Sequence, residues 1–156
     1  AEDSSYTLAG AGLAALHQLD PQLAEPILNQ LIGQPKKGKL LAVWINLMLS
    51  STDEKVLTEI VHSYAKMELN QEKFDLTLKL CEWLGKTSST FLVKGGVDAV
   101  IKFRDAVPEQ FGLGPVFNNL LQGIINKKEA ALTLALDKAL YQEQIEYIRK
   151  KLSGKK

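Results

Sequence analysis

The sequence predicts an all-α protein of about eight helices, stacked as antiparallel hairpins. Strand signals are nearly absent, because the chain has no Asn-Gly or Asp-Gly hairpin turn and no long run that alternates apolar and polar residues. Helix caps and helix-ending glycines recur instead. The 156 residues are 46% hydrophobic and 24% charged, an ordinary globular composition. We therefore expect one helical domain over 1–152 and a disordered basic tail at 153–156.

Small and capping residues define the first two helices. Asp3-Ser4-Ser5-Tyr6 opens a helix rich in Ala and Gly, whose small side chains would let a neighbouring helix approach closely. Asp20 is an N-cap, and Pro21 follows it at the first helical position, where a missing N–H costs nothing. Pro26 falls inside the second helix, so we expect a kink or a restart there.

Further caps and stops divide the rest of the chain. Ser51-Thr52-Asp53-Glu54 has the spacing of a capping box in which Ser51 caps the helix, and Asn70 caps the next one. Gly33, Gly85 and Gly154 lie where helices would end. Loops are expected at 33–38 and 108–114, and the last helix could break near Asp137. The helices are expected near 5–19, 21–32, 38–50, 53–67, 71–84, 89–107, 115–127 and 129–152.

The apolar patterns indicate how deeply these helices are buried. The helix near 53–67 has a polar stripe, which includes Glu59 and His62, so it should face water on one side. The helix near 38–50, with Trp44 at its centre, has almost no polar face and requires burial on several sides.

The spacing of the hairpins suggests a repeat. They begin near Ser5, Lys37 and Asn70, 32 to 33 residues apart, which suits a two-helix repeat of the HEAT type. The fixed residues of tetratricopeptide and ankyrin repeats are missing. The expected architecture is a HEAT- or armadillo-like right-handed α-superhelix.

Histidine and cysteine are too few to predict a catalytic or metal site. Glu59 lies three residues before His62, a spacing seen in carboxylate-bridged metal sites, but such sites need more inward-facing carboxylates. A solvated pair is therefore favoured, and His17 is the only other histidine. Cys81 lies on an apolar stripe, which favours an inert core thiol over a nucleophile.

The remaining chemical groups also favour structural roles. Asp53-Glu54 and the pair Glu143 and Glu146 are interpreted as capping and surface groups rather than acid–base catalysts. Gly10-Ala11-Gly12 has no preceding strand, so it is not a phosphate loop. The sequence thus predicts no catalytic, cofactor-binding or metal-binding residue. Aromatic residues at helical spacing are expected in the core rather than at a ligand, namely Trp44, Phe74, Trp83 and Phe117.

Charge argues against a nucleic-acid-binding protein, because the net charge is only +1. Residues 123–156 nevertheless carry eight Lys or Arg against four acids. A solvated basic last helix is favoured over a steering or binding patch. No apolar run reaches the ~18 residues of a membrane span.

Two sets of residues resemble one family. Asp3-Ser4-Ser5-Tyr6, Ala14-Ala15-Leu16 and Leu19-Asp20-Pro21 resemble the start of the C-terminal helical domain of bacterial M1 zinc aminopeptidases, the aminopeptidase N-like metallopeptidases. The middle of the chain, about 35–100, is similar only in helical character. The terminal helices of the same domain resemble Ala106-Val107-Pro108-Glu109-Gln110-Phe111, Leu121-Gln122-Gly123-Ile124, Lys127-Lys128-Glu129 and the stretch from Gln144-Ile145-Glu146-Tyr147-Ile148 to Leu152.

The resemblance implies a non-catalytic role. In that family the zinc, its His-Glu-x-x-His ligands, the Gly-x-Met-Glu-Asn motif and a catalytic Tyr belong to an upstream domain, and this sequence contains none of these motifs. The chain is therefore expected to be a piece of a longer bacterial protein, as its missing initiator Met suggests. It would pack on the catalytic domain of the same polypeptide, shape access to the peptide cavity and contact peptide substrate there.

Other readings stay open. The chain could be a free-standing helical-repeat scaffold that binds a protein partner, and a nucleic-acid-binding helical domain is less favoured because of the charge. The compartment, cytoplasmic or periplasmic and secreted, is left undetermined, since a single cysteine carries no information about it.

Overall fold

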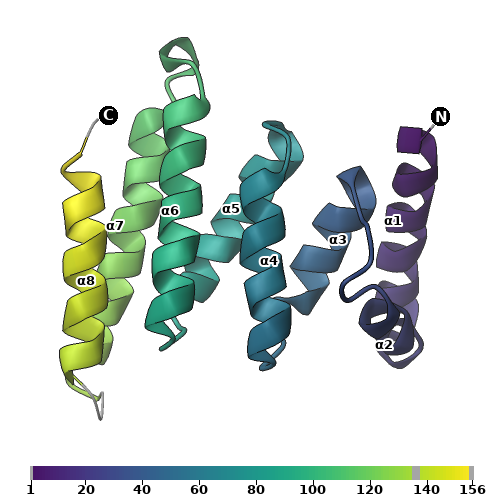
Figure 1. Cartoon of the computed structure of the whole chain (residues 1–156), viewed down its shortest axis with the longest axis horizontal. Coiled ribbons are helices and arrows are strands. Elements are labelled where there is room, and N and C mark those ends of the chain that lie inside the picture. Colours follow the sequence, from purple (N-terminus) through teal and green to yellow (C-terminus); the bar gives the residue numbers. More distant parts are fainter. Residues whose placement is uncertain (1, 135–137, 155–156) are drawn as a thin grey trace. The chain divides into compact units, whose positions relative to one another are not determined.

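The structure is a computed structural model that describes residues 2–134 and 138–154. All regular structure in these residues is helical, which confirms the predicted all-α class, whereas the HEAT-like superhelix stays a prediction. Figure 1 shows the order of the elements. They are α1 (Glu2–Leu19), α2 (Pro21–Gln30), α3 (Gly38–Met48), α4 (Glu54–Lys66), α5 (Gln71–Leu84), α6 (Thr90–Ala106), the 3-10 turn η1 (Glu109–Phe111), α7 (Gly114–Ala131) and α8 (Lys138–Leu152).

The chain divides into two compact units, Ala1–Leu76 and Thr77–Lys156. The division falls inside α5, so this helix contributes its first residues to one unit and the rest to the other. Each unit has its own packed helices. The single domain expected over 1–152 stays a prediction.

In the first unit, α1 packs along α3 and forms a hairpin with α2. The two helices approach closely at Gly10, where an added Cβ would lie 2.6 Å from the carbonyl carbon of Lys39 and 2.7 Å from the amide nitrogen of Leu40. The close approach expected from the small residues is therefore confirmed at Gly10. At Gly12 an added Cβ would meet nothing within 4 Å, so this glycine has a different environment.

Helix α3 supplies a larger share of the core of the first unit than any other described helix. Trp44 is fully buried, and its Nε1–H donates to the carbonyl oxygen of Leu28 at 3.0 Å, which satisfies the one polar atom of the indole. The expected burial of this helix on several sides is confirmed. The buried residues of α3 are Leu40, Leu41, Ala42, Val43, Trp44, Ile45 and Met48.

The start of α2 follows the prediction. The Asp20 side chain accepts from the backbone N–H groups of Gln22 and Leu23, and Pro21 occupies the first turn. The helix runs from Pro21 to Gln30 without a restart, although Pro26 lies inside it.

The start of α4 differs from the prediction. Asp53 is the N-cap and accepts from the N–H of Lys55 at 2.9 Å, while the hydroxyl of Ser51 accepts from the N–H of Asp53 at 3.1 Å. Ser51 is thus not the cap, because the helix begins only at Glu54 and Asp53 is the residue adjoining it. Asn70 does cap α5, since its side-chain oxygen accepts from the N–H of Lys73 at 2.9 Å.

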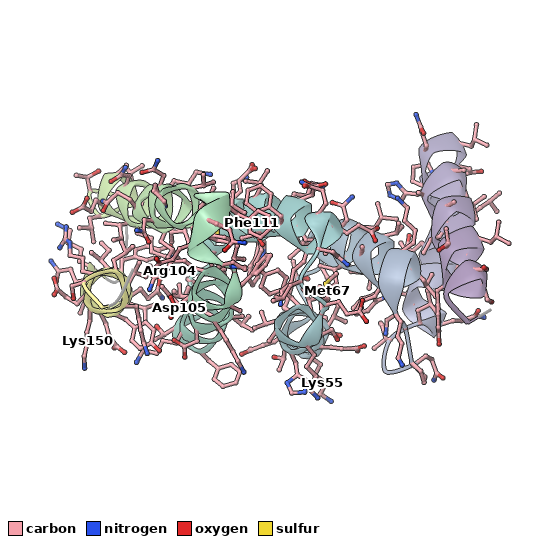
Figure 2. The ribbon with its side chains drawn as sticks, turned by 90° about the horizontal axis from the view of Figure 1, so that it is seen from above. Lys55, Met67, Arg104, Asp105, Phe111 and Lys150 are labelled. Carbon is pink, nitrogen blue, oxygen red and sulfur yellow. The ribbon has the colours of Figure 1, made fainter. Side chains whose placement is uncertain are left out.

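In the second unit, α6, α7 and α8 pack against one another in pairs. The rings of Phe103 and Phe117 meet edge to face with centroids 5.0 Å apart. Arg104 is also buried and donates to the side-chain oxygen of Asn118 on α7 at 2.9 Å. Figure 2 shows Arg104 between the ribbons of α6 and α7, whereas Lys150 on α8 points away from them.

The ends of the last helices differ in part from the prediction. α7 continues to Ala131 instead of ending near residue 127, because the residues there are good helix formers without Gly or Pro. The last helix, α8, accordingly begins at Lys138 and not near residue 129. The predicted break near Asp137 lies outside the described residues. In the predicted tail, the Ser153 and Gly154 amides donate to carbonyls of the last turns, while 155–156 lie outside the described residues. The predicted loop at 108–114 contains η1.

Candidate functional site

The two histidines of the chain lie on different helices of the first unit. His62 is exposed on α4, as expected, and His17 is half-buried on α1. The residues that the structure describes contain no group of three or more His, Cys, Asp or Glu side chains placed to hold a metal ion. Glu59 differs from the prediction, because it is half-buried rather than solvated beside His62.

Glu59 instead fastens the loop between α2 and α3. One carboxylate oxygen accepts from the backbone N–H of Gly33 at 2.9 Å, and the other lies 2.7 Å from Nζ of Lys36. The Lys36 side chain is only 2% exposed, and its ammonium also donates to the carbonyl of Gln34 and lies 4.1 Å from the centroid of the Trp44 ring. The Lys36–Glu59 ion pair, the hydrogen bonds to two backbone groups of the loop and the cation–π contact with Trp44 therefore come together around the Lys36 ammonium and the Glu59 carboxylate.

Two other buried lysines make the same kind of contact. Lys73 donates to the carbonyl of Met67 at 3.2 Å and lies 5.0 Å from the ring centroid of Tyr64. Lys128 donates to the carbonyl of Thr87 at 2.9 Å and lies 5.1 Å from the ring centroid of Tyr141. Each ammonium thus stabilises carbonyl groups beyond the end of a helix, where the backbone has no intrahelical partner.

The burial of these lysines is not among the predictions from sequence, although the sequence carries a signal for two of them. Lys128 continues the apolar stripe of Phe117, Leu121 and Ile124 at helical spacing, and Lys73 precedes Leu76 in the same way. A lysine in register with a buried stripe has to bury its stem, and its ammonium then needs a partner.

Lys128 and Gln144 together hold the α5–α6 loop from α7 and α8. The Gln144 amide nitrogen donates to the carbonyl of Ser88 at 2.9 Å and to the hydroxyl of Thr90 at 3.0 Å. Burial lowers the pKa of Lys128 from 10.5 to about 8, because a buried ammonium loses its hydration. Gln144 is fully buried as well.

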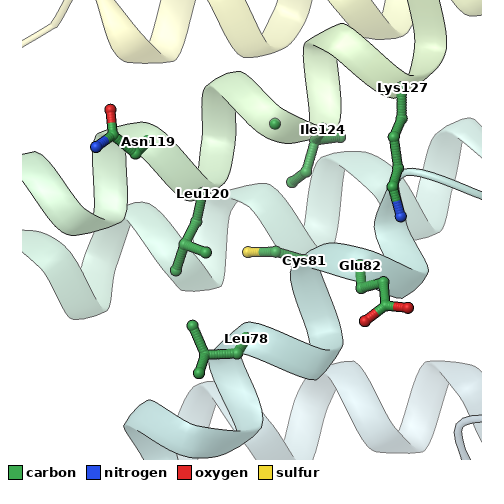
Figure 3. Close-up of a pocket in the computed structure, with 8 residues that line it drawn as sticks. Leu78, Cys81, Glu82, Asn119, Leu120, Ile124 and Lys127 are labelled. Carbon is green, nitrogen blue, oxygen red and sulfur yellow. The ribbon is translucent and has the colours of Figure 1, made fainter.

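Cys81 behaves as the predicted core thiol. It is buried, and burial raises its pKa from 9.0 to about 12, so the nucleophilic thiolate is strongly disfavoured. Its sulfur lies between Leu78 and Leu120 in a shallow groove between α5 and α7 (Figure 3). Glu82 and Lys127 lie at one end of this groove.

The groove is small and mostly apolar. Its volume is about 200 Å³, which is below the roughly 300–1,000 Å³ of a typical small-molecule site. A second hollow of about 210 Å³ lies beside η1 and is lined by the loop from Val107 to Pro115. Neither has the converging polar groups that orient a substrate.

The acidic residues and aromatics follow the structural interpretation in most cases. Glu143 lies 3.1 Å from Nζ of Lys94, and Glu146 lies 3.3 Å from a guanidinium nitrogen of Arg149. Among the predicted core aromatics, Trp44 and Phe117 are fully buried, whereas Phe74 and Trp83 are only half-buried.

A polar cluster joins α6 to α8. The Tyr147 hydroxyl donates to the carboxylate of Asp98, which also lies 3.6 Å from Nζ of Lys151. Partial burial and the adjacent Asp98 raise the pKa of Tyr147 from 10.0 to about 12, so the phenol stays protonated. Lys151 of α8 is therefore partly neutralised by Asp98 of α6, and the interpretation of the last helix as a solvated surface stays a prediction.

The outer face of α1 is apolar and unpartnered within the first unit. Leu8 is 75% exposed and Leu19 is 85% exposed, and the small residues Gly12 and Ala15 between them are exposed too. We call these four residues the α1 stripe.

No helix of the described residues is long and apolar enough to span a bilayer.

Comparison with family models, with curated proteins and with solved structures finds no match to this chain.

Proposed function

We propose that the chain is the C-terminal helical domain of an M1 zinc aminopeptidase. In this role it packs on the catalytic domain of the same polypeptide and shapes access to the peptide cavity. The zinc and the residues that hydrolyse the peptide bond belong to that other domain. The chain itself contributes surface and no reacting group.

The observation that carries the proposal is the structural role of the residues that resemble the family. Asp20 caps α2 and Pro21 begins it, so this motif sets the turn between the first two helices. Pro108 directly precedes η1. Among the apolar residues of the C-terminal motifs, Leu121 and Ile148 are fully buried in the second unit, whereas Phe111 is 64% exposed. The resemblance therefore lies in residues that build a helical domain.

The chemistry of the polar side chains also supports a structural role. Glu59 is held by Lys36 and by a backbone amide, Asp53 caps a helix, and Glu143 lies against Lys94. Cys81 has a raised pKa. Each of these carboxylates thus has a structural partner, and the raised pKa of Cys81 disfavours its nucleophilic thiolate.

The first experiment measures zinc and activity on the purified chain. We expect no stoichiometric zinc and no hydrolysis of aminoacyl anilides, and substantial hydrolysis by rigorously pure protein would refute the proposal. The second reads the gene upstream of Ala1. An upstream segment of several hundred residues with a His-Glu-x-x-His motif would support the proposal, whereas a start codon just before Ala1 would sink it.

A second candidate function is a free-standing helical-repeat scaffold that binds a protein partner. The observation that favours it is the exposed α1 stripe, because an unpartnered apolar face of this kind often marks an interaction site. The same reading of the gene separates the two candidates.

A further inference from the structure

Helix α1 has two apolar faces, of which one is covered. Gly10 and Leu13 are buried on the side that packs along α3, with Leu13 only 5% exposed. The α1 stripe lies on the other side of the helix, because Leu8, Gly12, Ala15 and Leu19 follow one another at steps of four, three and four residues. A helix that is apolar on both sides is typical of a buried helix rather than of a helix at a surface.

The stripe also lacks charge. Residues 4–19 contain no Asp, Glu, Lys or Arg. An apolar neighbour on this part of the helix would therefore remove none of these charged side chains from water. The last helix is built in the opposite way, since α8 exposes Glu143, Glu146 and Lys150.

The order of residue sizes along the stripe is symmetric. It runs large, small, small, large. The large pair, Leu8 and Leu19, and the small pair, Gly12 and Ala15, have the same midpoint, between residues 13 and 14. If two copies of α1 lie antiparallel with their midpoints together, Leu8 of one copy faces Leu19 of the other. Gly12 then faces Ala15, so the small residues let the two backbones come close at the centre. A two-fold interface requires this self-complementarity.

We propose that α1 is a self-association surface, through which the chain pairs antiparallel with a second copy by its α1 stripe. The pairing buries the exposed Leu8 and Leu19 of both copies and leaves no charge unpaired. It places the two helix dipoles antiparallel, which avoids repulsion between like ends. The proposal does not depend on the proposed function, because it uses only the geometry of α1.

The size of the surface predicts a weak dimer. One helix pair buries less than the roughly 1,600 Å² of a standard interface, so it belongs with the small, transient contacts. We expect a dissociation constant on the order of 10–100 µM. The chain should therefore be monomeric when dilute and should associate as its concentration rises.

The test is the mass of the chain in solution, measured by sedimentation equilibrium from about 5 to about 500 µM, a range that brackets the expected constant. The mass should rise from 17.2 kDa toward twice that value. Leu8→Lys and Leu19→Lys should each weaken the association at least tenfold. Both side chains are exposed, so the variants should keep the helical circular dichroism and the melting temperature of the unmodified chain.

Phe91→Lys is the matched control. Phe91 is also an exposed large apolar residue, 68% exposed, but it lies on α6 in the second unit. This variant should associate as the unmodified chain does. A chain that stays monomeric over the whole range would overturn the proposal, and so would a dimer that survives both lysine substitutions on α1.

Cross-linking tests the antiparallel register. Chains with Gly12→Cys are mixed with chains carrying Ala15→Cys and treated with a short bis-maleimide. The antiparallel pair brings residue 12 of one chain to residue 15 of the other. Random pairing in an equal mixture would make half of the cross-linked product mixed, so the mixed product should exceed half of the total. The unmodified chain serves as the control for the buried Cys81. A mixed product of half or less would refute the register.

Discussion

The ammonium of Lys36 lies 2.7 Å from a carboxylate oxygen of Glu59. The two residues are separated by 23 positions and join the α2–α3 loop to the middle of α4. Since Lys36 is nearly buried and Glu59 is only partly exposed, this pair is screened less than an ion pair at the surface. It also explains why Glu59, on the polar stripe of α4, is only partly exposed to water.

Loss of Glu59 should destabilise the chain. Glu59→Gln leaves the buried Lys36 ammonium without its carboxylate, and we expect unfolding free energy to fall by about 1–3 kcal/mol. Urea unfolding followed by circular dichroism measures this. His62→Gln, one turn away and exposed, is the control and should change stability by less than about 0.5 kcal/mol. Equal effects of the two substitutions would show that the Lys36–Glu59 pair contributes nothing.

Two glycines of α1 should respond to alanine with opposite signs. At Gly10 the new Cβ would overlap the backbone of Lys39 and Leu40, so α1 and α3 must separate, at a cost of about 1–3 kcal/mol. At Gly12 the space is open, and alanine should stabilise the helix by about 0.5–1 kcal/mol. Thermal and urea unfolding of dilute samples measure both. If Gly10→Ala proves as stable as Gly12→Ala, the close approach of α1 and α3 is wrong.

Trp44→Ala should cost about 3–5 kcal/mol, because it empties the largest buried side chain of the first unit. Trp44→Phe keeps most of the volume but removes the donor to the Leu28 carbonyl, so it should cost less. Denaturant unfolding compares the two variants. A loss below about 1 kcal/mol for Trp44→Ala would contradict the central position of α3.

Lys128 should make stability depend on pH in the alkaline range. Its pKa is about 8 in the folded chain against 10.5 for the free side chain, so the unfolded state binds more protons between these values. The Lys128 contribution to stability therefore rises as the pH passes from about 8 toward 10.5, by about 1–2 kcal/mol once solvent screening is allowed for. Below pH 8 the cost of burying the ammonium is fully present.

The comparison with Lys128→Met isolates this effect. Cys81 and Tyr147 both have raised pKa values in the folded chain. Each therefore lowers the stability of the chain as the pH rises above the pKa of the group in the unfolded state, 9.0 for the thiol and 10.0 for the phenol. Their contributions cancel when the stability of Lys128→Met is subtracted from that of the unmodified chain at each pH. The difference should move in favour of the unmodified chain between pH 7.5 and about 10. A flat difference would refute the lowered pKa.

Cys81 should react slowly with Ellman's reagent at pH 8. Burial raises its pKa to about 12, so the folded chain holds very little thiolate. The rate should reach that of a free thiol in denaturant. Ala15→Cys provides an exposed thiol in the same chain and should react fast without denaturant. Rapid labelling of Cys81 in the folded, unmodified chain would contradict its burial.

Much of the fold could be predicted from local signals. Asp20 and Pro21 act within one turn of the chain, and the apolar α3 around Trp44 admits only a buried helix. The start of α4 was assigned to the wrong cap, because Ser51 and Asp53 are both good caps and the choice depends on where the helix begins. The end of α7 was missed because no breaking residue marks it.

The prediction that the chain holds no assembled site depends on which residue types are present. The structural roles of the polar side chains could not be predicted from residue types. Glu59 finds its partner 23 residues earlier in the chain, a distance that helical periodicity does not address. The buried Lys36, Lys73 and Lys128 depend on an aromatic ring and on loop carbonyls from other segments. Such contacts are tertiary. A sequence pattern that treats every lysine as exposed to solvent therefore fails to predict that these lysines are buried.

The three buried lysines also divide the chain's amines into two chemical populations. Acetylating reagents need an accessible, neutral amine, so exposed lysines such as Lys55 and Lys150 should be modified first. Lys36, Lys73 and Lys128 each sit against a different inter-helix connection. Each would become reactive only when its own connection opens. Timed acetylation read by mass spectrometry would therefore report, connection by connection, the order in which the helices come apart.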